Sequence, residues 1–237
     1  KERKIPNLAI SKRFSDLVRK HRPSAVINSR ISYGAIAGTK GLDTSLFDYL
    51  SLKDQGIPSR KLPLYAESPD SITHSYGYDA RPDVHYRSAE ELLGRMAQVV
   101  AGNGNYLLNV GPTGNGEIPV QAVKELKVIG EWLKLNGKAV YGVQGSPFLN
   151  QPRGGKAKYA PVTTKENRLY VFCKTGQESV TLPGLKSAVT KAWVLASSKA
   201  VEFEQTPEKL TLQLSSGEDS FMPVIAVECA GETIKIK

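Results

Sequence analysis

One segment constrains the fold more than any other part of this chain. Residues 102–119 read GNGNYLLNVGPTGNGEIP, an apolar run that ends in Asn109 and breaks into a turn rich in glycine and proline. An amphipathic segment follows over residues 120–135, with apolar side chains at helical spacing. A strand that delivers a polar residue to a loop just before a helix is how a β/α barrel builds its catalytic rim. The segment therefore predicts a barrel-type βα unit.

The first 148 residues repeat this alternation of strands and helices. Periodicity predicts helices over residues 10–22 and 89–100, and strands over residues 25–28, 62–66 and 106–110. The second of these helices opens with a capping box, in which Ser88 is the cap and Glu91 lies three residues on. Strands that alternate with helices indicate a parallel sheet with crossover helices, so the predicted fold class is α/β.

The pattern changes after about residue 146. A linker-like stretch covers residues 150–155, and no helical pattern follows it. Short apolar runs separated by turn residues instead predict strands over residues 168–174, 178–182, 190–196, 209–214, 224–228 and 233–236. This spacing is typical of an antiparallel β-sandwich. We therefore expect two domains, the second half of a (β/α)8-type barrel over residues 1–148 and a β-sandwich over residues 149–237.

The barrel part is too short to close on itself. A β/α barrel needs eight strands and about 250 residues, and residues 1–148 supply about half of that. Half a barrel leaves open sheet edges and an uncovered apolar interior. We therefore expect the C-terminal portion of a larger enzyme, with the N-terminal half of the barrel supplied by the same protein or by a separate chain. A small, complete α/β unit is the rival interpretation.

The chain is basic, with a formal net charge of +9. One interpretation of this charge is a solvated surface rich in lysine. The other is a surface that attracts an anionic polymer such as a sulfated polysaccharide. No nucleic-acid-binding motif is present, and no apolar run is long enough to span a membrane. The first 20 residues lack an apolar signal core, so we expect any secretion signal to lie outside this chain.

The two cysteines give little chemistry to build on. Cys173 and Cys229 both lie in apolar, strand-like runs, so they are either buried free thiols or the partners of a single disulfide. The sequence contains no CxxC motif and no His/Cys cluster, which argues against a structural zinc site. We expect no metal and no cofactor.

Several motifs in the first 148 residues occur together in one known family. Besides residues 104–119, they are SDLVRKHRPSAVINSRI at residues 15–31, FDY and KDQGIP within residues 47–58, AESPDSITHSYGY at residues 66–78, and YRSAEEL at residues 86–92. In this order they resemble the glycoside hydrolase family 29 α-L-fucosidases. The resemblance covers nearly all of residues 9–148 and extends more loosely into the predicted sandwich.

This resemblance implies a β/α barrel followed by a β-sandwich, and a retaining exo-glycosidase that releases terminal α-L-fucose. Such enzymes use two carboxyl groups about 5 Å apart, one as the nucleophile and one as the acid/base. The family's nucleophile is an Asp in a WFDTP-like motif, which this sequence lacks, so we expect polypeptide before Lys1 to supply it. The implied partner is a fucosylated glycan or fucoside, and the implied location is secreted or periplasmic. Whether the protein forms a homo-oligomer is left open.

Glu67 is the candidate catalytic residue. It follows the strand predicted over residues 62–66, and catalytic groups of barrel enzymes lie at the carboxyl ends of strands. The resemblance places it at the Glu of the family's WET motif, with Ala66 replacing the Trp, and so implies the acid/base role. A solvated loop glutamate is the alternative interpretation, and Asp54 and Asp70 are weaker substitutes for the role.

Four further residues are candidates for substrate binding. Asn28 and Arg30 close the strand predicted around residues 25–28, where a guanidinium can hold a carboxylate or a sugar hydroxyl, or form a structural ion pair. Tyr76 stands where the family has Trp, and its ring can pack on the apolar side of fucose or simply within the loop. His74 can bind a hydroxyl or can be a solvated loop residue.

Two other functions compete with hydrolysis. A non-catalytic carbohydrate-binding module would use an exposed pair of aromatic side chains on the sandwich, where Trp193, Tyr159 and Tyr170 are available. A basic scaffold that binds polyanions would show steep salt dependence and no pocket. The unusual loop over residues 35–46, together with the positive charge, motivates the narrower hypothesis of a sulfated or acidic glycan substrate.

Overall fold

The computed structural model describes residues 8–32, 44–58, 61–148, 160–214 and 221–236. Its first part alternates helices and short strands: α1 (Leu8–His21), β1 (Leu50–Ser51), β2 (Ala66–Ser71), α2 (Ala89–Ala101), β3 (Gly104–Asn109) and α3 (Val120–Asn136). Short 3-10 turns η1 (Ser29–Ser32), η2 (Thr44–Leu46) and η3 (Gly137–Ala139) connect them. The linker expected at residues 150–155 and most of the loop over residues 35–46 lie outside the described residues.

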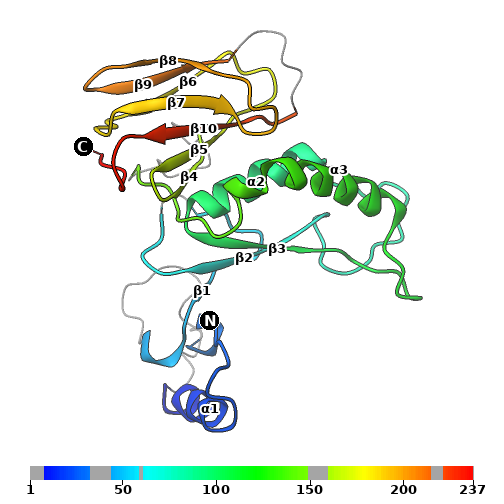
Figure 1. Ribbon diagram of the computed structural model, residues 1–237. Coiled ribbons are helices and arrows are strands. Elements are labelled where there is room, and N and C mark those ends of the chain that lie inside the picture. The colour runs from blue at the N-terminus through cyan, green and yellow to red at the C-terminus, as the bar shows by residue number, and fades with distance from the viewer. Residues whose placement is uncertain (1–7, 33–43, 59–60, 149–159, 215–220, 237) are drawn as a thin grey trace, which may run out of the picture.

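The strands of this first part form one parallel sheet in the order β1-β2-β3. A further parallel bridge joins Asn28 to Tyr49, so the backbone after α1 runs alongside β1. In Figure 1, α2 and α3 lie together on one side of β2 and β3, and α1 lies apart from them near β1. The predicted parallel pairing is therefore confirmed, and α2 is the crossover helix between β2 and β3.

The helices form where their sequences predict. Ser88 caps α2, and its hydroxyl accepts a hydrogen bond from the backbone N–H of Glu91, which is the N-cap half of a capping box. The predicted apolar face of α2 is buried along its length: Ala89, Leu92, Leu93, Met96 and Val100. Helix α3 matches its predicted span to within one residue, and the indole of Trp132 donates to the carbonyl of Met222 in the same core.

Helix α1 forms as predicted, but its apolar stripe points outward. Ile10, Phe14 and Leu17 are 52%, 58% and 51% exposed, whereas Ser11 and Ser15 are buried. The helix is held by polar contacts, since the Ser15 hydroxyl donates to the Leu46 carbonyl. Arg19 adds an ion pair with Asp48 at 2.8 Å. The face that usually drives a helix onto a core therefore has no cover among the described residues.

The second part of the chain consists of two antiparallel sheets. One has the order β4-β5-β10-β7 and the other the order β6-β9-β8. Their bounds are β4 (Val162–Lys165), β5 (Arg168–Phe172), β6 (Ser179–Pro183), β7 (Val189–Val194), β8 (Glu202–Gln205), β9 (Lys209–Gln213) and β10 (Val224–Cys229). A buried apolar cluster fills the space between the sheets, with Leu169, Leu182 and Leu212 among its members.

The two parts share a second core. The outer face of the four-stranded sheet, with Tyr170 and Phe172, packs against Met96 of α2 and Trp132 of α3. Figure 1 shows the resulting layers, with α2 and α3 between the parallel strands and the antiparallel sheets. The helices thus bury one face against β2 and β3 and another against the second part of the chain.

Three sequence-based strand assignments are wrong. Residues 25–28 form no strand, and Asn28 makes only an isolated parallel bridge to Tyr49. Residues 62–65 are irregular, and the strand expected at residues 62–66 instead runs from Ala66 to Ser71. Residues 233–236 form no strand, and Ile236 makes only an isolated bridge to Leu185. Strands β4 and β8 were not predicted, because their polar residues obscure a period of two.

Cys173 and Cys229 are buried free thiols, so the disulfide alternative is wrong. Burial raises the pKa of the Cys173 thiol to about 12, and burial together with the charge of Glu228 raises that of Cys229 to about 11. Within the described ranges, the structure contains no helix long and apolar enough to cross a membrane.

Candidate functional site

The carboxyl ends of the parallel strands gather most of the residues singled out from the sequence. Arg30 follows the Asn28 bridge, Asp54 follows β1, and His74 and Tyr76 follow β2. Because parallel strands end at one edge of their sheet, these loops form a common rim. The rim is the candidate functional site.

Arg30 is the centre of this rim. Its Nη2 donates to Oδ1 of Asp54 at 2.5 Å and to the Leu52 carbonyl at 3.2 Å, and its Nε donates to the Ser51 hydroxyl at 2.7 Å. The side chains of Arg30 and Asp54 are 42% and 59% exposed, so the pair is open to solvent and to a ligand. Such an exposed pair adds little to stability by itself. It does present a cation and a carboxylate side by side.

Asn28 shapes the backbone of the rim. Its Oδ1 accepts a hydrogen bond from the backbone N–H of Arg30 at 3.1 Å, which is an Asx-type turn. Asn28 is half-buried, and its own backbone pairs with Tyr49. The structure therefore gives Asn28 a role in orienting Arg30.

Tyr76 and His74 lie on the loop after β2. The Tyr76 hydroxyl donates to the Pro69 carbonyl at 3.1 Å, and the ring is 37% exposed. Burial, followed by the nearby charge of Asp54, raises the pKa of Tyr76 above its usual value. The His74 carbonyl accepts a hydrogen bond from the Gln55 side chain at 3.1 Å, and the residue is exposed.

Asn109, at the end of β3, fixes the loop of Tyr76. Its Nδ2 donates to the Tyr76 carbonyl at 2.8 Å. The two loops also touch at Gly111, where an added Cβ would lie 2.8 Å from backbone atoms of Gly77 and Tyr78. The loops after β2 and β3 therefore form one packed unit.

Glu67 occupies a different place from the one expected. It is the second residue of β2, so it lies near the amino end of that strand. It pairs in register with Ser51, the last residue of β1, and paired residues of neighbouring strands point to the same face of a sheet. Since Ser51 contacts Arg30, Glu67 shares the face of the sheet that carries Arg30. The Glu67 side chain is partly exposed there.

A buried charge cluster behind the rim escaped the sequence analysis. Asp70 is 1% exposed, and it receives hydrogen bonds from Arg95 at 2.5 Å, Tyr106 at 2.8 Å and Arg87 at 3.2 Å. Burial alone would raise the pKa of Asp70, but the hydrogen bonds from Arg95 and Tyr106 outweigh burial and lower it. Asp70 points to the helix side of the sheet and stays ionised, so it does not suit the role of a proton donor.

The described residues show no cluster of metal-ligand side chains, and the aromatic residues singled out on the antiparallel sheets are buried or partly covered there. No group of three or more His, Cys, Asp or Glu side chains gathers in the described part of the chain. Tyr170 is buried, and Trp193 is partly covered by Arg168 and Lys191, whose cations lie 5.8 Å and 5.1 Å from its ring centre. Tyr159 lies outside the described residues.

Comparison with known proteins identifies the family. Residues 4–138 match the family model described as alpha-L-fucosidase. The plasma alpha-L-fucosidase of Rattus norvegicus is 34% identical over 122 residues, which is 51% of this chain and 25% of that protein. The alpha-L-fucosidase of Dictyostelium discoideum is 38% identical over 107 residues, or 45% of this chain and 23% of that protein. The chain belongs to the α-L-fucosidase family, as its motifs predicted.

Solved structures of other α-L-fucosidases share the fold. Alpha-L-fucosidase isoenzyme 1 from Paenibacillus thiaminolyticus superposes with a TM-score of 0.77 at 25% identity, over 93% of this chain and 54% of that chain. The alpha-L-fucosidase from Vibrio sp. strain EJY3 gives a TM-score of 0.75 at 25% identity, over 95% of this chain and 39% of that chain. The matches thus span about a quarter of the curated relatives and about half of the Paenibacillus structure.

Proposed function

We propose that this chain carries the substrate-facing rim of a glycoside hydrolase that releases terminal α-L-fucose from fucosylated glycans or fucosides. Membership of the α-L-fucosidase family supports the reaction class. The observation that carries the proposal is the exposed Arg30–Asp54 pair at the carboxyl ends of the parallel strands, beside Tyr76 and His74. Charged groups beside an aromatic ring can bind sugar hydroxyls and pack on the apolar side of the sugar.

We propose Glu67 as the acid/base of this reaction. Its place on the same sheet face as Arg30, level with the end of β1, supports access to the rim. Asp54 is the competing carboxylate, because it lies on the rim itself and contacts Arg30 directly. In a retaining reaction the acid/base protonates the leaving oxygen, and then deprotonates the water that releases the sugar.

Hydrolysis of an α-L-fucoside by the active protein tests both proposals. We expect Glu67→Gln to lower kcat by about 100-fold or more, which is typical for the loss of a general acid/base. The loss in kcat/KM, which reports the step that breaks the fucoside bond, should be smaller with 4-nitrophenyl α-L-fucoside than with an alkyl fucoside, because 4-nitrophenolate leaves without protonation. If Asp54→Asn shows this pattern and Glu67→Gln does not, the role passes to Asp54. Absence of hydrolysis by the wild-type protein would overturn the proposed function.

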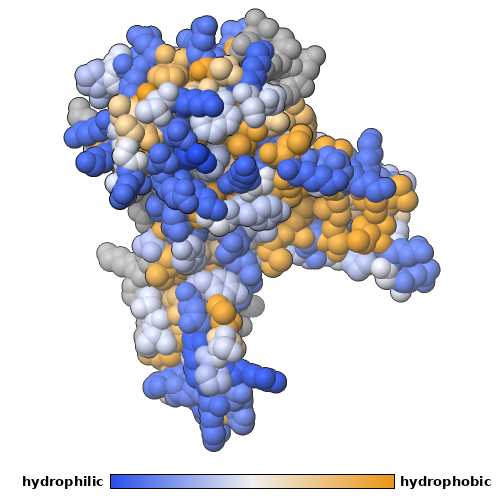
Figure 2. Space-filling model, viewed as in Figure 1, coloured by the Kyte–Doolittle hydropathy of each residue, from blue (hydrophilic) through white to orange (hydrophobic). Residues whose placement is uncertain are grey.

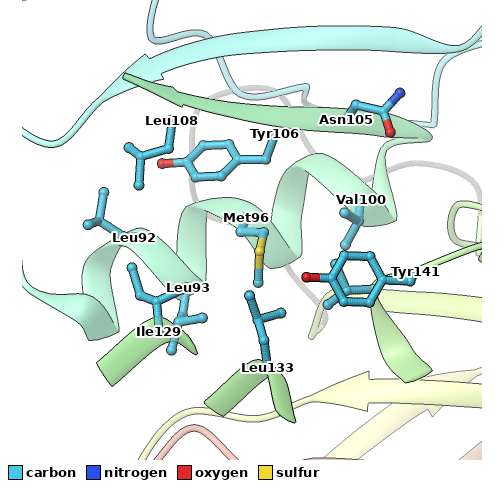
Figure 3. Close-up of a pocket in the computed structure, with 11 residues that line it drawn as sticks. Leu92, Leu93, Met96, Val100, Asn105, Tyr106, Leu108, Ile129, Leu133 and Tyr141 are labelled. Atoms are coloured by element: carbon cyan, nitrogen blue, oxygen red, sulfur yellow. The ribbon is translucent and has the colours of Figure 1, made fainter. Parts of the chain in front are cut away.

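We also propose that the parallel sheet is half of a β/α barrel and that the antiparallel sheets form a β-sandwich. Two apolar surfaces that no described residue covers support the half-barrel. One is the outward stripe of α1, with Phe14 and Leu17. The other is a groove of about 290 Å³ between β3, α2 and α3, lined by Met96, Tyr106 and Leu133 among others. Figure 3 shows these side chains converging on the groove, and Figure 2 shows apolar surface along the same region.

The proposed partner is the complementary half of the barrel, which would cover both apolar surfaces and supply the nucleophile. Strand β3 is at the edge of its sheet, so it can accept a further strand. Fluorescence of the dye 8-anilinonaphthalene-1-sulfonate reports exposed apolar surface and tests this pairing. We expect strong dye binding by this chain alone and a clear loss once the complementary half is added. Equal dye binding in both samples would contradict the pairing.

A sulfated or acidic glycan is the proposed refinement of the substrate, and a secreted or periplasmic location is proposed with it. The net charge of +9 supports attraction to such a glycan, since a positive surface concentrates anionic ligands. Parallel assays on sulfated and unsulfated fucosides at 50 mM and 300 mM salt test this refinement. Equal rates without salt dependence would rule it out.

A further inference from the structure

Gln55 has a backbone conformation that a residue with a side chain rarely adopts. Its φ angle is +56°, in the left-handed region that favours glycine. It is the third residue of a turn from Lys53 to Gly56, closed by a hydrogen bond from the Gly56 N–H to the Lys53 carbonyl at 2.7 Å. A strained backbone conformation at the edge of a candidate site indicates that the side chain of this residue has a role there.

All four polar groups of Gln55 are bonded, and their partners are four different residues. The backbone N–H donates to the Pro69 carbonyl at 2.7 Å, and the backbone carbonyl accepts from Nη2 of Arg95 at 2.9 Å. The side-chain oxygen accepts from Nη2 of Arg87 at 2.9 Å, and the side-chain nitrogen donates to the His74 carbonyl at 3.1 Å. Gln55 therefore joins the loop after β1 to the loop after β2 and to α2.

Arg87 and Arg95, which donate hydrogen bonds to Gln55, are themselves fixed by buried contacts. Both contact the buried Asp70, and their own side chains are only 14% and 18% exposed. A guanidinium with several fixed partners has little freedom to move. The position of Gln55 is therefore set by the buried Asp70 cluster and not by solvent.

This arrangement positions Asp54. It directly precedes Gln55 in the turn, and its carboxylate meets Arg30 at 2.5 Å on the exposed side of the rim. The other end of the turn is held as well, because the Ser68 hydroxyl donates to the Gly56 carbonyl. A turn held at both ends fixes the backbone from which the Asp54 carboxylate reaches Arg30.

We infer that Gln55 is a positioning residue, which holds Asp54 against Arg30 and ties the His74 loop to the same frame. It acts on the sugar through these residues, by connecting the buried Asp70 cluster to the exposed rim. The effect on activity rests on the proposed function, whereas the effect on the turn does not. The two effects can therefore be measured separately.

The first test measures the mobility of the turn without any substrate. Gln55→Gly removes the amide group but makes the left-handed backbone easier, so folding is protected. We expect amide ¹⁵N order parameters of residues 53–56 to fall from about 0.85 to below about 0.6, the range of flexible backbone. The matched control is Gln177→Ala, which removes a glutamine that bonds Lys174 and Ser179 in a distant turn. Unchanged order parameters in Gln55→Gly would overturn the inference.

The second test measures activity of the catalytically active protein towards an α-L-fucoside. We expect Gln55→Gly to lower kcat/KM at least tenfold, with the melting temperature close to that of wild type. In an Asp54→Asn background the same substitution should cost less than twofold, because the residue that it positions is already altered. Equal losses in both backgrounds would show that Gln55 does not act through Asp54. An inactive wild type would overturn the proposed function alone, since the mobility test still decides the role of Gln55.

Discussion

Arg95 on α2 donates its Nε hydrogen to Oδ2 of Asp70 on β2, at 2.5 Å. The two residues are 25 positions apart in the sequence, and their ion pair crosses the layer between helix and sheet. Asp70 is almost fully buried, so its charge depends on this partner and on Arg87. The pair therefore fixes the helix against the strand that leads to the rim.

Removing the Asp70 charge should be costly. Asp70→Asn leaves two arginines without their buried counter-ion, so we expect a loss of about 3–5 kcal/mol in the free energy of unfolding. Urea denaturation followed by circular dichroism measures this loss. Asp16→Asn serves as the control, because Asp16 pairs with Lys12 on an exposed helix surface and should lose under about 1 kcal/mol. Similar losses in both variants would contradict the role of the buried pair.

Stability should also depend on pH through the same carboxylate. The folded pKa of Asp70 lies below the ordinary value of 3.8, so its stabilising contribution is present above pH 3.8. That contribution should disappear as the pH falls through the folded pKa and the carboxylate becomes protonated. We therefore expect the stability difference between wild type and Asp70→Asn to shrink steadily below pH 3.8. A difference that stays constant down to pH 2 would argue against a lowered pKa.

The contact between two rim loops makes Gly111 sensitive to substitution. Gly111→Ala would place a methyl group 2.8 Å from the backbone of Gly77 and Tyr78, so one loop must move. We expect a loss of about 1–3 kcal/mol, the usual cost of an overpacked position, measured by thermal unfolding. Gly114→Ala is the matched control, because nothing lies within 4 Å of its added Cβ. Equal melting temperatures for the two variants would exclude the close contact.

The outward stripe of α1 should matter for assembly and little for the fold of this chain. Phe14 is 58% exposed, so Phe14→Lys should change the free energy of unfolding by less than about 0.5 kcal/mol. The same variant should bind the complementary barrel half at least tenfold more weakly in isothermal titration calorimetry. Lys20→Ala, on an exposed part of α1, is the control that should bind normally. Normal binding by Phe14→Lys would remove α1 from the proposed interface.

Local rules predicted the helices of the first part well. The capping box at Ser88 and the apolar period of α2 and α3 gave bounds within one or two residues. Helix α2 buries the face that its sequence displays, whereas α3 buries its face only in part. The same rules failed for β2, whose residues Glu67, Ser68 and Asp70 lack the composition of a buried strand. Tertiary hydrogen bonds compensate there, as when the Ser68 hydroxyl donates to the Gly56 carbonyl.

The candidate site was predictable only where local sequence motifs carried the information. Motif resemblance singled out Asn28, Arg30, His74 and Tyr76, and the structure brings them to neighbouring loops. It could not reveal the partners of Asp70, because Arg87, Arg95 and Tyr106 lie 17, 25 and 36 positions away. No local pattern encodes contacts across such distances. The role of Gln55 was hidden for the same reason, because its partners Arg87 and Arg95 are also distant in the sequence.

The two buried thiols have a practical consequence for work on the rim. Cys173 and Cys229 ionise only far above neutral pH, and their surroundings are apolar, so maleimide reagents should leave them unmodified in the folded protein. A cysteine introduced at an exposed rim position could then carry a fluorophore or a spin label without removal of the native thiols. Distances across the rim could be followed in solution while a fucoside binds.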